Sequence, residues 1–168
     1  METSIKLYSL KANEIKTYTF AALFVTGNLA LPQICHLIPL GGQMLLPIYF
    51  FTLIAAYKYG FFTGLITAVA SPIINHLLFG MPVFEMLPIL LIKSALLATA
   101  AAYMAQRTKE VKLTSLLLVI LFYQGIGMLA ELAITGSMFA AMQDIRLGIA
   151  GMLLQLFGGY FCLKALKK

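Results

Sequence analysis

Charged side chains are scarce in this sequence. Lys, Arg, Asp and Glu make up 11% of its 168 residues and apolar residues 61%, whereas a typical soluble domain is about a quarter charged. No charged residue occurs between Lys16 and Lys58, and further uncharged runs cover residues 59–84, 113–130 and 147–163. One small core cannot bury this much apolar surface, so the composition predicts a membrane protein with lipid as its solvent.

Catalytic motifs are also missing. Asp144 is the sole aspartate, which excludes a pair of aspartates inside the membrane. The sequence contains no P-loop and no Gly-rich dinucleotide turn, which excludes ATP binding by those means. No serine lies in a Gly-x-Ser-x-Gly elbow, and Cys35 and His36 are adjacent rather than spaced as metal ligands. We therefore expect no catalytic residue, metal or cofactor, and a small membrane enzyme is an interpretation without a motif behind it.

The net charge of +6 raises the question of nucleic acid binding. Basic residues form no stripe with interleaved aromatics and lie mostly at the ends of apolar runs. This distribution is typical of membrane topology signals, so we expect a lipid bilayer as a partner and no nucleic acid.

Apolar runs and the Gly and Pro residues between them predict an all-α fold, a compact bundle of six transmembrane helices in a single domain over residues 1–168. The helices are expected over residues 18–35, 45–57, 60–79, 84–104, 113–132 and 146–165. A loop is expected over 106–112 and an outer connector over 133–145. No convincing cleavage site follows residues 18–35, so we interpret them as a retained helix rather than a signal peptide.

The positive-inside rule predicts the orientation. With residues 1–16 in the cytoplasm, ten of the twelve basic residues fall on the cytoplasmic side: Lys6, Lys11, Lys16, Lys58, Arg107, Lys109, Lys112, Lys164, Lys167 and Lys168. Arg146 then lies at the outer surface and Lys93 within a helix, so both termini are expected in the cytoplasm. Cys35 and Cys162 then lie near opposite membrane surfaces, too far apart for a disulfide.

Small residues recur every four positions on two expected helices. Such stripes let helices approach closely in lipid. Over residues 60–79 the stripe includes Gly60, Gly64 and Ala68, and we expect it to pack inside the bundle. Over residues 18–35 it consists of Ala22, Thr26 and Ala30, for which packing inside the bundle and contact with an external partner helix are both open.

Polar residues within the apolar helices are the candidate site, because hydrocarbon tolerates such groups only where they face a cavity or one another. Helical spacing puts Lys93, Gln124 and Gln155 at similar depths, from the outer half of the bilayer to its midplane. The mouth of a shared pocket is expected to involve Asn75, His76, Tyr123, Glu131 and Asp144. The alternatives are an ion pair of Lys93 with Glu131 or Asp144, interhelical hydrogen bonds for the two glutamines, and an interfacial place for His76.

Residues 45–104 carry a pattern of Gly, Pro and small residues: Tyr59-Gly60, Gly64, Ser71-Pro72, Gly80-Met81-Pro82 and Pro88. This pattern resembles the substrate-binding S components of energy-coupling factor (ECF) vitamin transporters, and the size and expected topology of the whole chain agree. The resemblance implies a multi-pass protein of a prokaryotic cell membrane that captures a vitamin-like small molecule near the outer face.

The resemblance also implies partners, namely a membrane coupling (T) subunit and two ABC-type ATPases, contacted in part through Ala22, Thr26 and Ala30. Thr26 departs from the alanine expected there. Lys93 stands where related sequences often have an acidic residue, which implies an anionic ligand if the position faces the site.

A non-transporting scaffold, similar to the small membrane protein of the rod-shape complex, is the alternative. This hypothesis predicts no ligand. Lys93 locked in an ion pair inside a tightly filled bundle favours it, whereas Lys93 facing a pocket argues against it.

Overall fold

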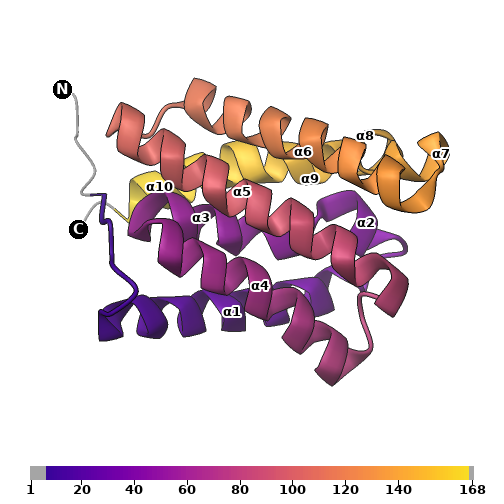
Figure 1. Cartoon of the computed structure of the whole chain (residues 1–168), viewed down its shortest axis with the longest axis horizontal. Helices are drawn as coiled ribbons and strands as arrows, with labels where there is room; N and C mark the ends of the chain where they lie inside the picture. The colour runs from indigo at the N-terminus through magenta and orange to yellow at the C-terminus, as the bar shows by residue number, and fades with distance from the viewer. Residues whose placement is uncertain (1–6, 167–168) are drawn as a thin grey trace.

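The computed structural model describes residues 7–166, and this range is helical with no β-strand (Figure 1). The elements are α1 (Ile15–Cys35), α2 (Gly41–Leu45), η1 (Pro47–Tyr49), α3 (Phe50–Tyr59), α4 (Phe61–Phe79), η2 (Phe84–Met86), α5 (Leu87–Thr108), α6 (Leu113–Thr135), α7 (Met138–Ala141), α8 (Gln143–Leu147), α9 (Ile149–Leu153), η3 (Leu154–Gly158) and α10 (Gly159–Ala165). The predicted all-α class is confirmed.

Both ends of the described chain lie at one end of the bundle, which we call the Lys58 end. The backbone N–H of Tyr8 donates to the carbonyl of Lys58, and Lys58 Nζ donates to the carbonyl of Leu166. The hydroxyl of Tyr57 reaches the α5–α6 loop, donating to the carbonyl of Glu110 at 2.7 Å. The opposite end, where α2, α7 and α8 lie, is called the α2 end (Figure 1).

The basic residues expected on one side of the membrane share the Lys58 end. The set comprises Lys11, Lys16, Lys58, Arg107, Lys109, Lys112 and Lys164, which lie at or next to helix ends that meet there. Lys6, Lys167 and Lys168 lie outside the described residues. The cytoplasmic placement of this end stays a prediction.

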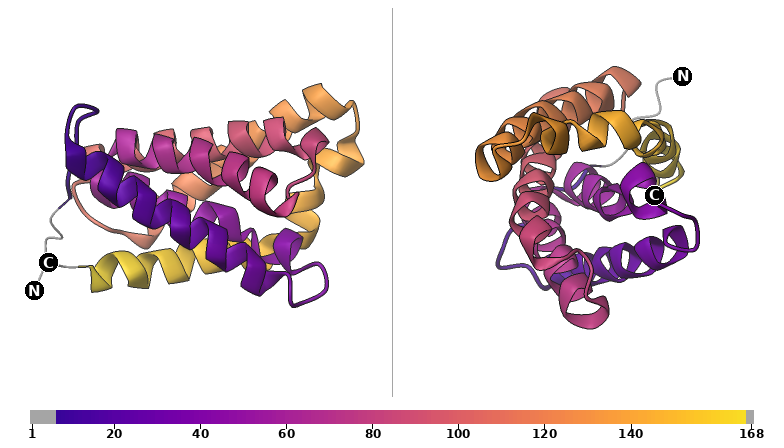
Figure 2. Two further views of the ribbon diagram at one scale, coloured as in Figure 1. Left: turned by 90° about the horizontal axis from the view of Figure 1, so that it is seen from below. Right: turned by 90° about the vertical axis from the view of Figure 1, so that its right-hand side faces the viewer.

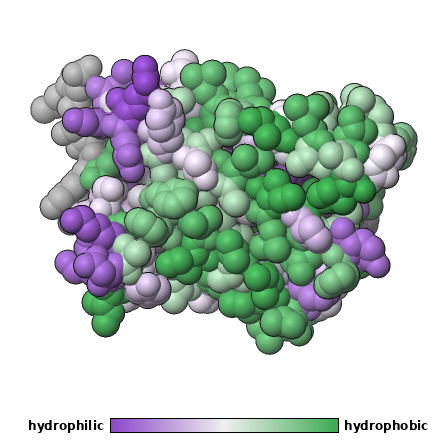
Figure 3. Space-filling model, in the orientation of Figure 1, coloured by the Kyte–Doolittle hydropathy of each residue, from purple (hydrophilic) through white to green (hydrophobic). Residues whose placement is uncertain are grey.

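Four helices are long and apolar enough to cross a membrane: α1, α4, η2 with α5, and α6. Large apolar side chains of α6, such as Leu118, Leu121 and Leu129, point outward. Figure 3 shows the surface that faces the viewer in Figure 1. Its middle is mainly hydrophobic, and its hydrophilic residues gather mostly toward the two ends of the bundle. These features support a membrane protein, while the count of six spans stays a prediction.

The expected continuous helix over residues 45–57 is wrong. The chain is divided at Leu46, whose φ is +46°, and Pro47 follows it; a residue before proline is disfavoured in the α-helical conformation. The following helix, α3, runs inside the bundle and packs against α1, α4, α5 and α10 (Figure 2). Its residues from Thr52 to Lys58 are at most 1% exposed, so this part of α3 has almost no surface left for lipid.

The expected helix over residues 146–165 agrees with the apolar helix Ile149–Ala165, whereas residues 146–147 belong to α8. The chain leaves α8 at Gly148 and continues through α9, the π-helical turn η3 and α10. The expected loop over 106–112 shortens to residues 109–112 because α5 continues to Thr108. The expected connector over 133–145 begins inside α6 and contains α7 and the start of α8. In both places the helix runs on to a residue in the left-handed conformation that ends it, Lys109 after α5 and Gly136 after α6, rather than ending with the apolar run.

The small-residue stripe of α4 packs inside the bundle as predicted. Gly64 and Ala68 are buried, and a Cβ at Gly64 would lie 2.3 Å from the Cβ of Ala56 on α3. The α1 stripe behaves differently, because Ala22, Thr26 and Ala30 are exposed. Packing inside the bundle is therefore wrong for α1, and contact with an external partner stays a prediction.

A buried polar network ties α1, α3 and α4 together. The Nδ2 of Asn28 donates to the hydroxyls of Thr52 at 3.0 Å and Ser71 at 3.1 Å. Asn75 Nδ2 donates to the carbonyl of Asn28 at 2.9 Å. The network holds α4 against α1 and places Asn75 beside the cavity described below. Both cysteines are free, Cys35 toward the α2 end and Cys162 toward the Lys58 end.

Candidate functional site

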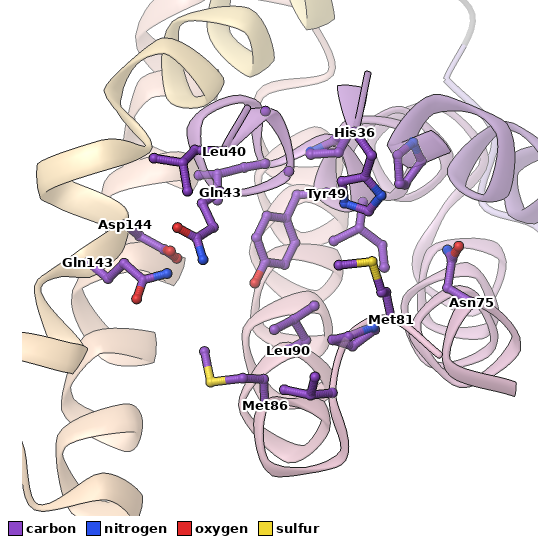
Figure 4. A pocket seen from close by; sticks show the side chains of 18 of the residues that line it. His36, Leu40, Gln43, Tyr49, Asn75, Met81, Met86, Leu90, Gln143 and Asp144 are labelled. Carbon is purple, nitrogen blue, oxygen red and sulfur yellow. The ribbon is translucent and has the colours of Figure 1, made fainter. Parts of the chain in front are cut away.

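A cavity of about 530 Å³ lies at the α2 end (Figure 4). Its walls come from the end of α1, the α2 turn, η1, α4, η2, α5, α6 and α8. Met81, Met86, Ile89 and Leu90 contribute apolar surface. Small-molecule sites are typically cavities of about 300–1,000 Å³ with mostly apolar walls and a few polar groups. This cavity therefore has the size and lining of a ligand site.

A buried ion triad forms the polar part of the cavity. Lys93 Nζ on α5 lies 2.5 Å from Oε2 of Glu131 on α6 and 2.9 Å from Oδ2 of Asp144 on α8. The Lys93 and Glu131 side chains are 2% exposed and Asp144 is 15% exposed. With all three groups ionised, two carboxylates face one ammonium, which leaves one negative charge in excess. Of the alternatives left open by the sequence, the geometry favours the ion pair for Lys93, with both carboxylates at once.

Gly127 makes room for the lysine. It lies one turn before Glu131 on α6, and a Cβ there would lie 2.6 Å from Cγ and 3.1 Å from Cε of Lys93. The stem of Lys93 therefore rests against the bare backbone of α6, which brings its ammonium group to the carboxylates. Gly125, two residues earlier, provides a matched comparison, because a Cβ added there would have no neighbour within 4 Å.

We expect Gly127→Ala to be about 1–3 kcal/mol less stable than Gly125→Ala. Both changes gain the same helix propensity, whereas only the first forces Lys93 away from its partners. The free energy of unfolding, measured by titrating the detergent-solubilised protein with SDS, checks this difference. Equal stability of the two variants would contradict the close packing of Lys93 on α6.

Tyr49 forms the wall between the cavity and the bundle core. Its ring packs on that of Tyr123, with centroids 5.3 Å apart and planes at 53°. The residue is 2% exposed, and its hydroxyl makes no hydrogen bond to any part of residues 7–166. Figure 4 shows the hydroxyl pointing into the cavity.

The structure brings four of the predicted site residues to the cavity lining, namely Asn75, Lys93, Glu131 and Asp144. The expected convergence of Gln124 and Gln155 with Lys93 is wrong, since neither is part of the described lining. Together with Tyr123 they form a separate buried cluster behind Tyr49. Tyr123 donates to Gln155 Oε1 at 2.9 Å, and Gln124 Nε2 donates to the Tyr123 hydroxyl at 3.2 Å. The depth of a residue along its helix does not determine the direction of its side chain.

His76 also lies outside the described lining. Its Nδ1 is 2.7 Å from the carbonyl oxygen of Pro82, so the ring connects α4 to the α4–η2 turn. His76 thereby supports the segment that carries Met81 into the cavity.

Sequence reasoning missed the α2 turn and Tyr49. His36, Gln43 and Tyr49 all line the cavity. The sequence predicts helices over residues 18–35 and 45–57, the second of which includes Tyr49, with Gly and Pro residues between them and no site residue in either segment. Polar residues such as His36 and Gln43, which lie between two apolar runs, are the signal that could have identified this segment as part of the cavity lining.

No protein-family model, curated protein or solved structure matches this chain. Within residues 7–166, no group of three or more His, Cys, Asp and Glu side chains is placed to hold a metal ion. The resemblance to ECF S components therefore stays a prediction, and the cavity is the feature that bears on function.

Proposed function

We propose that this chain is the membrane-embedded substrate-capture subunit of an ATP-driven micronutrient uptake transporter, similar to ECF S components, in a prokaryotic cell membrane. One observation carries the proposal: a cavity of about 530 Å³ opens beside three charged side chains inside the bundle. Buried charges in membrane proteins are costly and commonly mark ligand or ion sites. A vitamin or vitamin precursor is the proposed ligand.

Energy coupling is proposed to come from partners, namely a coupling (T) subunit and two ABC-type ATPases. The exposed stripe of Ala22, Thr26 and Ala30 supports this part of the proposal, because small residues allow close approach of another helix in lipid. Affinity purification of the chain from its native membrane is expected to recover an integral membrane protein and ATPase subunits.

The scaffold alternative is also supported by one observation, the pairing of Lys93 with both Glu131 and Asp144. Such an ion triad can stabilise the bundle without binding a ligand. The scaffold predicts a protein without a ligand, so ligand binding separates the two functions.

The test is binding of a panel of vitamins and their precursors to the purified chain in lipid nanodiscs. We expect at least one member to bind and to raise the stability of the protein, by about 2.7 kcal/mol at a concentration 100 times its Kd. Isothermal titration calorimetry and thermal unfolding provide the two readouts. A folded protein that binds no member of the panel would contradict capture and support the scaffold.

A further inference from the structure

We infer that the cavity binds a positively charged ligand, a small molecule with a protonated amine or other organic ammonium group on a compact apolar body. This inference rests on the proposed function and names the substrate class of the same site. It reverses the expectation of an anionic ligand that Lys93 suggests in the sequence.

The charge balance of the triad provides the first argument. Lys93 is already engaged by Glu131 at 2.5 Å and by Asp144 at 2.9 Å, so its charge is more than compensated. With all three groups ionised, an anionic ligand would add a like charge to a buried site with a negative excess, whereas a cation would neutralise that excess.

The second oxygens of the carboxylates remain available. Within residues 7–166, Glu131 Oε1 and Asp144 Oδ1 accept no hydrogen bond. Asp144 is the more exposed of the two at 15% and lies on α8, at the side of the cavity. An ammonium group entering the cavity can therefore donate to Asp144 without separating Lys93 from Glu131.

Tyr49 provides an independent argument. Its hydroxyl points into the cavity and has no partner in residues 7–166, although the residue is only 2% exposed (Figure 4). The hydroxyl is not among the described polar atoms that are buried without a hydrogen bond, so it is reached from the cavity, where an ammonium group can donate to its oxygen. The Tyr49 ring also presents π-electron density to a cation.

The remaining wall suits the apolar body of such a ligand. Met81, Met86, Ile89 and Leu90 belong to the lining, and methionine side chains adapt to ligands of different shape. Arg146, the basic residue nearest to Asp144 in the chain, is directed to another partner, because its guanidinium lies 3.9 Å from the centroid of the Phe139 ring. Among the lining residues that the structure describes, His36 is the other ionisable group besides Tyr49 and the triad.

The experiment measures Kd by calorimetry at pH 7 for probes of three charge classes. The cations are thiamine, choline and pyridoxamine, the neutral probes pyridoxine and nicotinamide, and the anions biotin, pantothenate and nicotinate. Pyridoxamine and pyridoxine share one ring skeleton and differ in the amine. We expect at least one of the cations to bind, and we expect a lower Kd for pyridoxamine than for pyridoxine.

Asp144→Asn is the decisive variant, because it removes one negative charge and leaves the Lys93–Glu131 pair in place. We expect it to weaken binding of pyridoxamine, whose ammonium group can donate to Asp144, by about 10-fold or more, the effect of a charge-assisted hydrogen bond. Choline and thiamine have no N–H on their cationic groups and should lose only the attraction of the charge. Tyr49→Phe, which keeps the ring, should weaken binding by a smaller factor. Glu85→Gln is the control, since Glu85 is an exposed carboxylate of η2 outside the described lining, and it should leave Kd unchanged.

The outcomes separate the class of ligand from the function. Binding confined to neutral or anionic probes, or a cationic probe whose Kd is unchanged or improved in Asp144→Asn, would overturn the cationic class and leave capture standing. If no probe of any class binds to the folded wild-type chain, both proposals fail. If Asp144→Asn does not fold, the Kd values of the wild-type protein for the three charge classes of probe decide whether the ligand is a cation.

Discussion

Lys93→Met is expected to destabilise the bundle by about 3–5 kcal/mol, the usual cost of leaving one member of a buried ion pair without its partner. The cost falls mainly on Glu131, whose side chain is 2% exposed and pairs with Lys93. Asp144 is more exposed and can be hydrated from the cavity. SDS titration of the purified variant, followed by circular dichroism, measures the loss.

A compensating change tests the cause. Replacing both members, as Lys93→Met with Glu131→Leu, should recover most of the stability, because an apolar pair of similar size is often as stable as a buried ion pair. The two single variants and the double variant form a double-mutant cycle, and we expect a coupling energy well above the error of the measurement. A double variant no more stable than Lys93→Met would show that lost packing, not the unpaired charge, causes the effect.

The same double variant separates the two proposed functions. A capture protein that has lost Lys93 and Glu131 should be folded but altered in ligand binding and uptake, because Asp144 then lies at the cavity without its lysine partner. A scaffold should tolerate the change, because its bundle remains packed. Two measurements on cells that carry the double variant separate the functions. Growth that depends on the micronutrient reports on capture, and cell shape reports on the scaffold.

Gly64→Leu is expected to lose about 3 kcal/mol, at the upper end of the usual range for overpacking. A Cβ at Gly64 would lie 2.3 Å from the Cβ and 2.6 Å from the Cα of Ala56. The second distance is to the backbone of α3, which cannot rotate away as a side chain can. Adding a leucine therefore forces α3 and α4 apart.

Gly125→Leu is the matched control. Its Cβ position on α6 has no neighbour within 4 Å, and the residue is exposed. The new side chain should lie against detergent or lipid with little change in the free energy of unfolding. Similar losses for the two variants would show that the α3–α4 contact is not the cause.

The effect of Gly64→Leu should extend to the cavity. The α3 helix follows directly from η1, which carries Tyr49, so moving α3 away from α4 moves this side chain. We expect any ligand identified for the wild-type protein to bind more weakly to Gly64→Leu and equally well to Gly125→Leu. Calorimetry with that ligand checks the difference.

The amino-acid sequence by itself determined the class of the protein and most helix positions. Long uncharged runs cannot be buried in a chain of 168 residues, so they predict helices in lipid. The ends of α4 agree with the prediction to within one residue, because Gly60 and Gly80 flank it. The start of α6 after Lys112 agrees as well. These features depend on composition and local breaks, which a sequence displays directly.

Only the tertiary structure decided which polar groups meet. Lys93 is 38 residues from Glu131 and 51 from Asp144, and their contact depends on how α5, α6 and α8 are rotated about their axes. Helical spacing predicts the depth of Gln155 but not that it faces Tyr123. The burial of α3 is likewise a result of packing by four other helices. Such contacts arise from the fit of side chains between distant segments, for which local periodicity contains no signal.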